Sequence, residues 1–337
     1  MVSLGTVQKN NSSLMDFGPN LVAVFVGGTS GIGEATARAF VRDTESSRVY
    51  LVGRNETQAS KIIEELRQIN PDGQISFVKC EAAHLHSVDE ACKLIQEKEE
   101  KVNLLFMTAG MMTTKGRDET EEGLDKKFSL HYYSRARFAL NLLPQLSRAA
   151  TANNSGKQGL GNNLSRVVSV LSPGDEISLH LDDLDLKTHY SLRNCAGHAT
   201  TMNSLLMQEL AAAHPATSFI HAYPGGVKTG LMRDFHPITQ MAINALAVFA
   251  KPWMVPLKES GERHLYASTS PQYPPQGSGS GDVAIGADGK PGSGAYLLSW
   301  DGSITGNKKV LEAARQNGTG KLVWKHTLEM FSSICGK

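Results

Sequence analysis

The chain has 337 residues, 40% of them hydrophobic, which is enough apolar material for one α/β domain of ordinary size. Its net charge of +1, without a basic run, argues against a nucleic-acid partner. The four cysteines form no C-x-x-C pair, no metal site is predicted, and no signal pattern opens the sequence, so we expect a cytoplasmic protein with reduced thiols. The longest nearly apolar stretch, 238–250, is too short and too polar to span a bilayer.

Apolar runs alternate with amphipathic stretches along most of the chain. In chain order they predict strand 21–26, helix 35–42, strand 49–52, helix 59–68, strand 75–78, helix 88–99, strand 103–107, helix 124–143 ended by Pro144, strand 166–171, helix 194–213, strand 218–222, strand 295–300 and helices 310–315 and 324–331. This alternation predicts an α/β fold with a doubly wound, mostly parallel sheet (Rossmann fold) and helices on both faces. Ligands of such sheets bind at the carboxyl ends of the strands.

The predicted organisation is one domain with additions at both ends. It comprises an N-terminal extension 1–20, a Rossmann-type domain 21–275, a Gly/Ser-rich loop 276–294, and a C-terminal appendage 295–337 of the same domain. The Ala-, Asn- and Gly-rich segment 150–163 is expected to be a surface loop.

The strongest motif lies between the first strand and the first helix. Glycines 27, 31 and 33 follow the apolar run with spacing Gly-x3-Gly-x-Gly, and a helix-forming stretch begins directly after them. Such a turn can hold a pyrophosphate, because glycine lets the backbone approach and the free N–H groups of the helix face the anion. The residues predicted to contact the cofactor here are Gly27, Thr29, Ser30, Gly31, Ile32 and Gly33.

With this spacing, the motif resembles the cofactor turn of the short-chain dehydrogenase/reductase family, and the resemblance extends over roughly residues 20–270. The extended N-terminus and segments 24–28, 132–135 and 218–221 together resemble a fungal branch of the family. Members of that branch often occur in specialised-metabolite pathways, and the family implies a nicotinamide dinucleotide and hydride transfer.

The end of the second strand bears on the choice of dinucleotide. NAD-dependent members place an acid there for the ribose 2′-OH, whereas this chain has Gly53 followed by Arg54 and Asn55. A guanidinium can bind a 2′-phosphate bidentately, and no nearby carboxylate is expected to repel it. We therefore expect NADP(H), the alternative being that Arg54 is only a solvated loop charge.

The resemblance implies further cofactor contacts. Glu81 occupies the position of the family's aspartate against the adenine, and Ala109 and Gly110 retain the end of an Asn-Asn-Ala-Gly turn whose asparagines are replaced. A Pro-Gly-x-Val-x-Thr turn is also matched, with the last residue expected to hold the nicotinamide amide; its positions are Pro224, Gly225, Val227 and Thr229.

The catalytic positions match the family poorly. Its members reduce ketones with an Asn-Ser-Tyr-Lys set, in which Tyr passes the proton, Lys lowers the Tyr pKa, Ser holds the carbonyl oxygen and Asn positions a water. These positions correspond to His131, Ser172, Ala196 and Thr200, so only the serine is retained.

Other side chains could supply the missing proton. His131 already occupies an active-site position, and Tyr190 precedes the helix that lacks the tyrosine, so a loop could bring it in. The predicted catalytic residues are therefore Ser172, His131 and Tyr190, with a structural histidine and an ordinary loop tyrosine as the alternatives. His198 points away from the site on its helix. A buried acid among Asp182, Asp183 and Asp185 is a further alternative.

The substrate side is predicted from segment 230–256, where apolar residues from Ile238 to Phe249 recur at helical spacing and suit a cover over a hydrophobic small molecule. A core-facing helix or a dimer contact is about equally compatible. A homodimer is possible, because family members commonly pair through two helices that here carry Tyr133, Phe138 and Met207, which could equally be core.

Three functions compete at this point. The first is an NADP(H)-dependent oxidoreductase with a non-standard proton donor, acting on a hydrophobic carbonyl, imine or alcohol. The second is a scaffold repurposed for non-redox cyclisation, isomerisation or dehydration, and the third is a non-catalytic NADP-binding protein.

Overall fold

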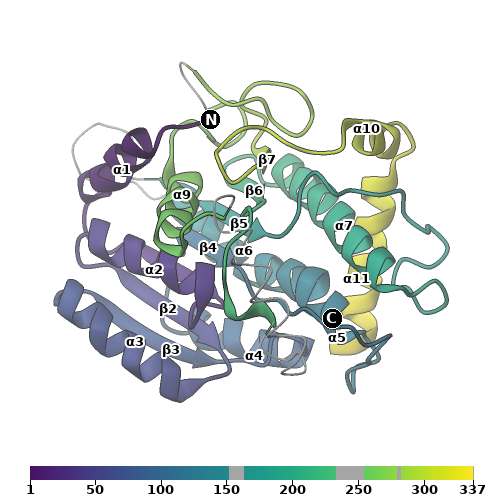
Figure 1. Ribbon diagram of the computed structural model, residues 1–337, viewed down its shortest axis with the longest axis horizontal. Coiled ribbons are helices and arrows are strands. Elements are labelled where there is room, and N and C mark those ends of the chain that lie inside the picture. Colours follow the sequence, from purple (N-terminus) through teal and green to yellow (C-terminus); the bar gives the residue numbers. More distant parts are fainter. Residues whose placement is uncertain (152–162, 233–253, 279–281, 337) are drawn as a thin grey trace.

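A seven-stranded sheet forms the centre of the computed structural model, which describes residues 1–151, 163–232, 254–278 and 282–336 (Figure 1). The strand order is β3-β2-β1-β4-β5-β6-β7 and every pair is parallel, so the predicted doubly wound fold is confirmed. The strands are β1 (Val22–Val26), β2 (Arg48–Gly53), β3 (Gln74–Lys79), β4 (Leu104–Met107), β5 (Arg166–Val170), β6 (Ser218–Ala222) and β7 (Ala295–Leu298).

Helices cover both faces of this sheet, and the two apolar cores lie between helices and strands. One core joins the sheet to the first group of helices: α1 (Leu4–Ser12), α2 (Gly31–Asp43), α3 (Glu56–Ile69) and α9 (Leu257–Thr269). The other joins it to the second group: α4 (Leu85–Gln96), α6 (Ser134–Thr151), α7 (Leu192–Ala213), α10 (Lys308–Gln316) and α11 (Thr319–Cys335). Because both faces are covered, strands such as β1 and β5 are buried at every position. Among the described residues, no helix is long and apolar enough to cross a bilayer.

The predicted helix 124–143 differs in the structure. It consists of α5 (Lys126–Phe128), a π-helical turn η2 (Ser129–Tyr133) and α6, which continues to Thr151 with Pro144 inside it. The prediction that Pro144 ends the helix is therefore wrong. The buried face continues beyond the proline with Leu146 and Ala149, so packing against the sheet offsets the hydrogen bond that proline cannot make.

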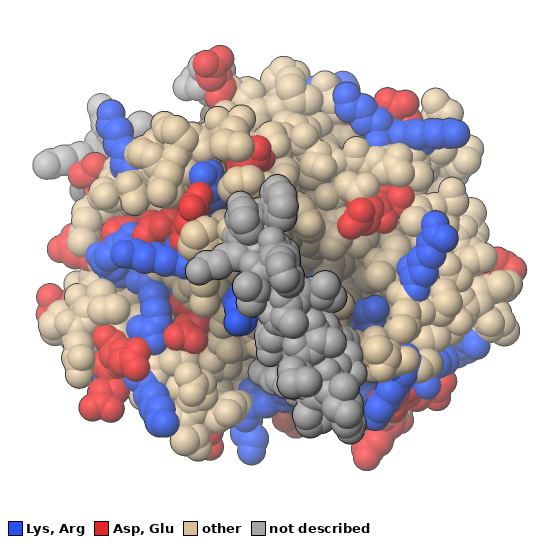
Figure 2. Space-filling view, in the orientation of Figure 1, with Lys and Arg blue, Asp and Glu red and all other residues tan. Residues whose placement is uncertain are grey.

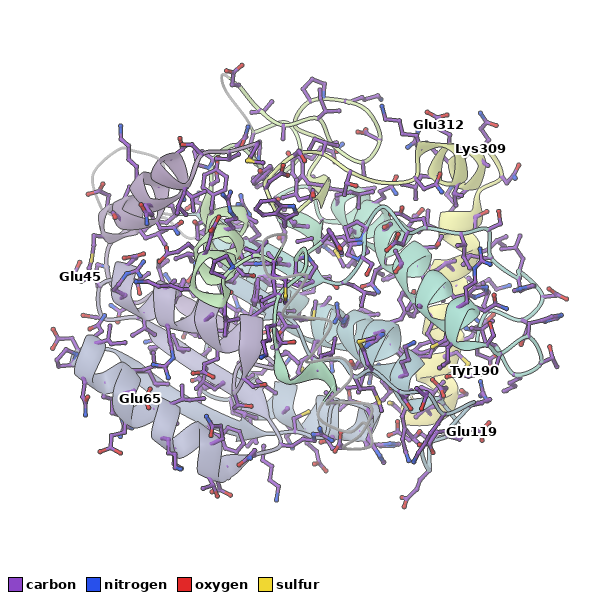
Figure 3. The ribbon with its side chains drawn as sticks, viewed as in Figure 1. Glu45, Glu65, Glu119, Tyr190, Lys309 and Glu312 are labelled. Carbon is purple, nitrogen blue, oxygen red and sulfur yellow. The ribbon has the colours of Figure 1, made fainter. Side chains whose placement is uncertain are left out.

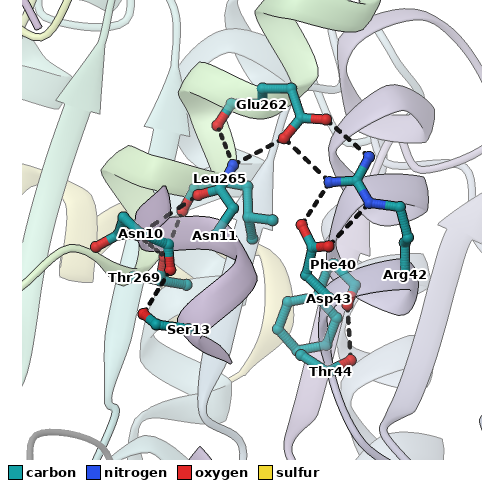
Figure 4. A network of polar contacts seen from close by, with 10 residues as sticks. All are labelled: Asn10, Asn11, Ser13, Phe40, Arg42, Asp43, Thr44, Glu262, Leu265 and Thr269. Atoms are coloured by element: carbon teal, nitrogen blue, oxygen red, sulfur yellow. Dashed lines mark hydrogen bonds and ion pairs between the residues drawn. The ribbon is translucent and has the colours of Figure 1, made fainter. Parts of the chain in front are cut away.

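The N-terminal segment is fastened to the fold through a polar network (Figure 4). After α1 it forms a short 3-10 turn, η1 (Ser13–Phe17). The Asn11 amide donates to both the carboxylate and the backbone carbonyl of Glu262 on α9, each at 2.9 Å. Arg42 of α2 donates to the same carboxylate at 2.8 Å. One buried acid therefore joins three helices that are distant in the sequence.

The end of the chain adds a strand and a helical layer. β7 pairs with β6, and α11 then lies along α7 and α4 (Figure 1). The hydroxyl of Tyr132 bonds that of Thr327 at 2.6 Å, and the Tyr133 hydroxyl bonds the His326 ring at 2.8 Å. Tyr133, Phe138 and Met207, which the sequence left between core and dimer surface, are core residues of the single chain.

Two predicted segments lie wholly or largely outside the described residues. These are the loop 150–163 and the apolar stripe of the substrate cover, although the cover's first residues form a short 3-10 turn, η3 (Gly230–Met232). Within the Gly/Ser-rich segment, Gly286 N–H donates to the carbonyl of Lys290 at 2.8 Å, so part of it is a hydrogen-bonded turn.

Candidate active site

A cavity of about 530 Å³ lies at the carboxyl ends of the strands, where the strand order reverses between β1 and β4. The residues that follow β1 to β6 line it, so it extends from the β3 side of the sheet to the β5–β6 side. Over the molecular face shown in Figure 2, acidic and basic side chains are interspersed, as expected for a net charge of +1. A cavity of this volume lies within the range that is usual for small-molecule and cofactor sites.

The glycine turn has the geometry that its sequence predicts. Gly27 and Gly31 have positive φ angles of 85° and 57°, and α2 begins at Gly31, directly at the cavity. Thr29, Ser30 and Ile32 also line the cavity. Gly33 lies behind the turn, where an added Cβ would be 2.4 Å from the carbonyl oxygen of Gly27. Glycine is therefore required there so that α2 can pack closely on the turn.

Arg54 and Asn55 line the β2–β3 end of the cavity together with Glu81. The expectation that no carboxylate lies near Arg54 is wrong, because Nη1 of Arg54 is 3.4 Å from Oε2 of Glu81. The two residues follow adjacent strands in register, Gly53 opposite Lys79, which brings them together although 27 positions separate them. Asn55 caps α3 by accepting the N–H of Gln58 at 2.9 Å.

The opposite end of the cavity joins three loops. Ala109, Gly110, Pro224 and Thr229 line it, whereas Gly225 and Val227 are not among the described lining residues. A Cβ on Gly31 would be 3.3 Å from the Thr229 side chain, so the glycine turn and the 224–229 turn meet across the cavity.

Gly225 serves a different purpose from its neighbours in that turn. Its φ angle is 72°, and a Cβ there would be 3.0 Å from the Trp300 ring, so the residue packs against the segment that follows β7.

His131 and Ser172 both line the cavity. The His131 Nε2 accepts the backbone N–H of Met111 at 3.2 Å, which leaves the proton of the neutral ring on Nδ1. Burial, followed by the charges of Arg135 and Lys127, lowers the pKa of His131 well below 6.5, so the ring is neutral at physiological pH. The His131 ring can therefore donate a hydrogen bond from Nδ1, but it does not serve as a general acid.

Tyr190 is placed differently from the expectation. It is not among the described lining residues; it lies directly before α7, half-buried and packed against the core, at the lower right in Figure 3. Its hydroxyl is buried without a hydrogen-bond partner among the described residues, and burial, together with the nearby Cys195 and Asp125, raises its pKa. This placement argues against Tyr190 as the proton donor.

Helix α7 carries the positions of the family's Tyr and Lys, yet neither Ala196 nor Thr200 lines the cavity in the described part of the chain. A loop is bound to this helix at Gly197 and Thr201. Ile177 N–H donates to the Thr201 hydroxyl, which donates back to the Ile177 carbonyl, both at 2.9 Å. Gly197 permits this contact, since a Cβ there would lie 2.3 Å from the Ile177 side chain.

His198 and Asp183, both considered above as sources of the missing proton, also stabilise this loop. The His198 Nε2 accepts the N–H of His180 at 3.1 Å, consistent with the prediction that it bonds outside the site. Asp183 accepts backbone N–H groups from Lys187, Thr188 and His189, and although burial raises its pKa, these bonds lower it on balance. The Asp183 carboxylate is thus ionised and structural, which removes it as a buried acid.

Arg135, which no sequence pattern indicated as a site residue, lines the cavity although its side chain is almost fully buried. Its guanidinium donates to the carbonyls of Leu130, Val170 and Ala109 and to the Ser169 hydroxyl, at 2.7–3.2 Å. The sequence carried no clear signal for it, because Arg137 stands two positions away in the same helix and only the fold shows that Arg135 is buried while Arg137 pairs with Asp89.

The chain resembles known proteins along its whole length. The family model for the short chain dehydrogenase matches residues 21–157. Oxidoreductase AN1596 of Emericella nidulans is 44% identical, covering 97% of each chain. Short-chain dehydrogenase/reductase SAT2 of Stachybotrys chartarum is 29% identical over 95% of this chain and 94% of its own.

Solved structures share the fold. The carbonyl reductase Sniffer of D. melanogaster has a TM-score of 0.57 at 16% identity, covering 86% of this chain and all of its own. An NADPH-bound carbonyl reductase from chicken fatty liver has a TM-score of 0.55 at 16% identity, with the same coverage.

Proposed function

The chain belongs to the short-chain dehydrogenase/reductase family, and we propose that it is an NADP(H)-dependent oxidoreductase acting on a carbonyl, imine or alcohol of a hydrophobic small molecule. The observation that carries this proposal is the continuous cavity from Arg54 to Ser172, lined by the glycine turn. We also propose a role in specialised metabolism, which the resemblance of segments 24–28, 132–135 and 218–221 to a fungal branch of the family implies. The four thiols are free, as expected in the reducing cytoplasm, which we propose as its location.

Residues of the chain fit the cofactor at both ends. Gly31 and Ile32, at the start of α2, line the cavity, and the free N–H groups of this first turn would hold the pyrophosphate, while Arg54 would bind the 2′-phosphate in place of Glu81. Ala109, Gly110 and Thr229 would bound the nicotinamide. When bound, the cofactor supplies or accepts a hydride, so the protein needs only to position the substrate and stabilise the charge that develops.

Ser172 and His131 are the polar groups available for the substrate. The serine hydroxyl and the Nδ1–H of the neutral imidazole would donate hydrogen bonds to the reacting oxygen or nitrogen. Neither residue is a strong acid here, so a proton that ends on the product would come from solvent through the cavity. This differs from the family's tyrosine-dependent chemistry and agrees with the loss of Tyr and Lys at Ala196 and Thr200.

Binding of NADPH and NADH, followed by fluorescence of the purified protein, tests the proposal first. We expect micromolar NADPH affinity and much weaker NADH binding, and then NADPH consumption in a screen of hydrophobic carbonyl and imine compounds that Ser172→Ala abolishes. Product formed without cofactor turnover would favour the non-redox alternative, and lack of binding of either dinucleotide would contradict the proposed function.

A further inference from the structure

Arg135 is a buried cation whose partners in the described part of the chain are all uncharged. A guanidinium has five N–H groups, and four of them are donated to three carbonyls and one hydroxyl. The fifth, on Nη2, has no acceptor among the described residues, and the side chain lines the cavity. Burial lowers the pKa of Arg135 to about 9, which leaves it charged at neutral pH.

The surroundings do not neutralise this charge. Among the described residues that line the cavity, the one carboxylate is Glu81, which lies at the β3 end and pairs with Arg54. At the β5 end, the neighbouring His131 is itself kept neutral by burial and by the Arg135 charge. Among the described residues that line the cavity, no carboxylate therefore balances the Arg135 charge at the substrate end, and a buried charge without a counter-ion is costly.

The bonds of Arg135 also fix its direction. The Ala109 carbonyl belongs to the loop after β4, and the Val170 carbonyl ends β5 two residues before Ser172. The guanidinium thus links the loop after β4 to the end of β5, and it cannot turn away without breaking four hydrogen bonds. A preorganised donor of this kind stabilises negative charge without reorganising.

We propose that Arg135 determines the substrate class by binding a negatively charged oxygen on a planar carbon, that is, a carboxylate or an enolate, at the β5 end of the cavity. This inference names the substrate class of the proposed function and rests on that function. It selects oxygen compounds over iminium cations, because a cationic substrate would be repelled by the fixed charge of Arg135.

Arg166 provides a matched control. It is equally buried, its guanidinium donates to the carbonyls of Ala267, Ser270 and Tyr273, and burial lowers its pKa to about 10. It lies on β5 outside the lining of the cavity. Arg135 and Arg166 therefore share their chemistry and burial and differ in their exposure to the cavity.

The test is a calorimetric titration of the full chain, with and without NADP⁺, with benzoate and with its neutral isostere benzamide. We expect benzoate to bind at least tenfold more tightly than benzamide, this preference to be lost in Arg135→Met, and to be kept in Arg166→Met. Arg135→Lys keeps the positive charge but cannot donate two parallel hydrogen bonds to one anion, so it should keep part of the preference for benzoate. The imidazole signals of His131, followed by NMR, should shift on benzoate binding, which locates the anion.

Several outcomes would overturn the inference: no benzoate binding to the wild type, equal binding of benzoate and benzamide, or an unchanged preference in Arg135→Met. If Arg135→Met does not fold, the wild-type comparison and Arg135→Lys still decide. The NADPH titration is read separately, so that a protein that fails to bind NADPH but prefers benzoate through Arg135 contradicts the proposed function and not this inference.

Discussion

Arg54 and Glu81 lie at the β2–β3 end of the cavity with Nη1 and Oε2 3.4 Å apart. Both side chains are about half exposed, at 55% and 43%, so their ion pair contributes little to folding stability. Glu81 instead forms an ion pair with the Arg54 guanidinium, which a 2′-phosphate would need as its own partner. A phosphate carries more charge and accepts bidentate bonds, so it would displace the carboxylate.

Arg54→Ala is expected to weaken NADPH binding about 10- to 100-fold, which corresponds to about 1.5–3 kcal/mol for hydrogen bonds to a charged group. NADH binding should change little, because NADH lacks the phosphate. Glu81→Gln is the matched variant: it removes the competing charge, so NADPH binding should be retained or strengthened. Fluorescence titrations measure both, and an equal loss for the two dinucleotides would contradict the assignment of Arg54.

Gly33→Ala is expected to abolish dinucleotide binding and to lower the free energy of unfolding by about 1–3 kcal/mol. Its Cβ would meet the Gly27 carbonyl at 2.4 Å and the Thr108 hydroxyl at 2.6 Å, both within the closely packed turn. Gly116→Ala is the control, since nothing lies within 4 Å of its Cβ position. Urea unfolding and NADPH titration of both variants check this, and normal binding by Gly33→Ala would show that the turn can relax.

Buried histidines should make the protein less stable as the pH falls below about 6.5. Burial lowers the pKa of His131 and His221 well below 6.5, and that of His264 to about 4. Between the folded and unfolded pKa values the unfolded chain binds more protons, so stability is fully present above pH 6.5 and decreases as the pH falls.

Each such histidine costs about 1.4 kcal/mol per pH unit in that range. Urea unfolding between pH 7.5 and 5 measures the slope, and His131→Gln should reduce it. A slope that His131→Gln leaves unchanged would mean that this ring is protonated in the folded protein.

Glu262→Gln should lower the free energy of unfolding by about 1–3 kcal/mol, because a buried acceptor of bonds from Asn11 and Arg42 is weakened (Figure 4). Burial raises the Glu262 pKa, but the bonds from Arg42 and Asn11 lower it on balance, so its contribution is present above its unfolded pKa and lost as the pH falls through the folded one.

Glu65→Gln removes the exposed partner of Arg38 and should change stability by less than about 0.5 kcal/mol. Denaturation at pH 7 compares the two variants. Equal effects would contradict the role of Glu262 as a junction of three helices.

Tyr190→Phe is expected to leave turnover and NADPH binding unchanged, whereas Ser172→Ala should reduce turnover strongly. The Tyr190 hydroxyl is buried away from the cavity, and Ser172 lines it. Rates with one active compound from the carbonyl screen measure the difference. A large loss in Tyr190→Phe would show that the loop before α7 moves into the site.

The sequence determined the elements that depend on local geometry. All seven strands were predicted within a few residues, because fully buried parallel strands are short apolar runs bounded by turns. The glycine turn could also be predicted from the sequence, because the positive φ angles of Gly27 and Gly31 restrict the residue type at those positions.

Only the tertiary structure decided what residues distant in the sequence do to one another. The pairing of Arg54 with Glu81 follows from the register of β2 and β3, and the binding of a loop to Gly197 and Thr201 of α7 brings Ile177 onto a helix that lies far from it in the sequence. Arg135 is held at the site by four bonds, one to Leu130 of η2, two to Ser169 and Val170 of β5, and one to Ala109 after β4. Such contacts depend on packing across the sheet, which no local spacing of residues encodes.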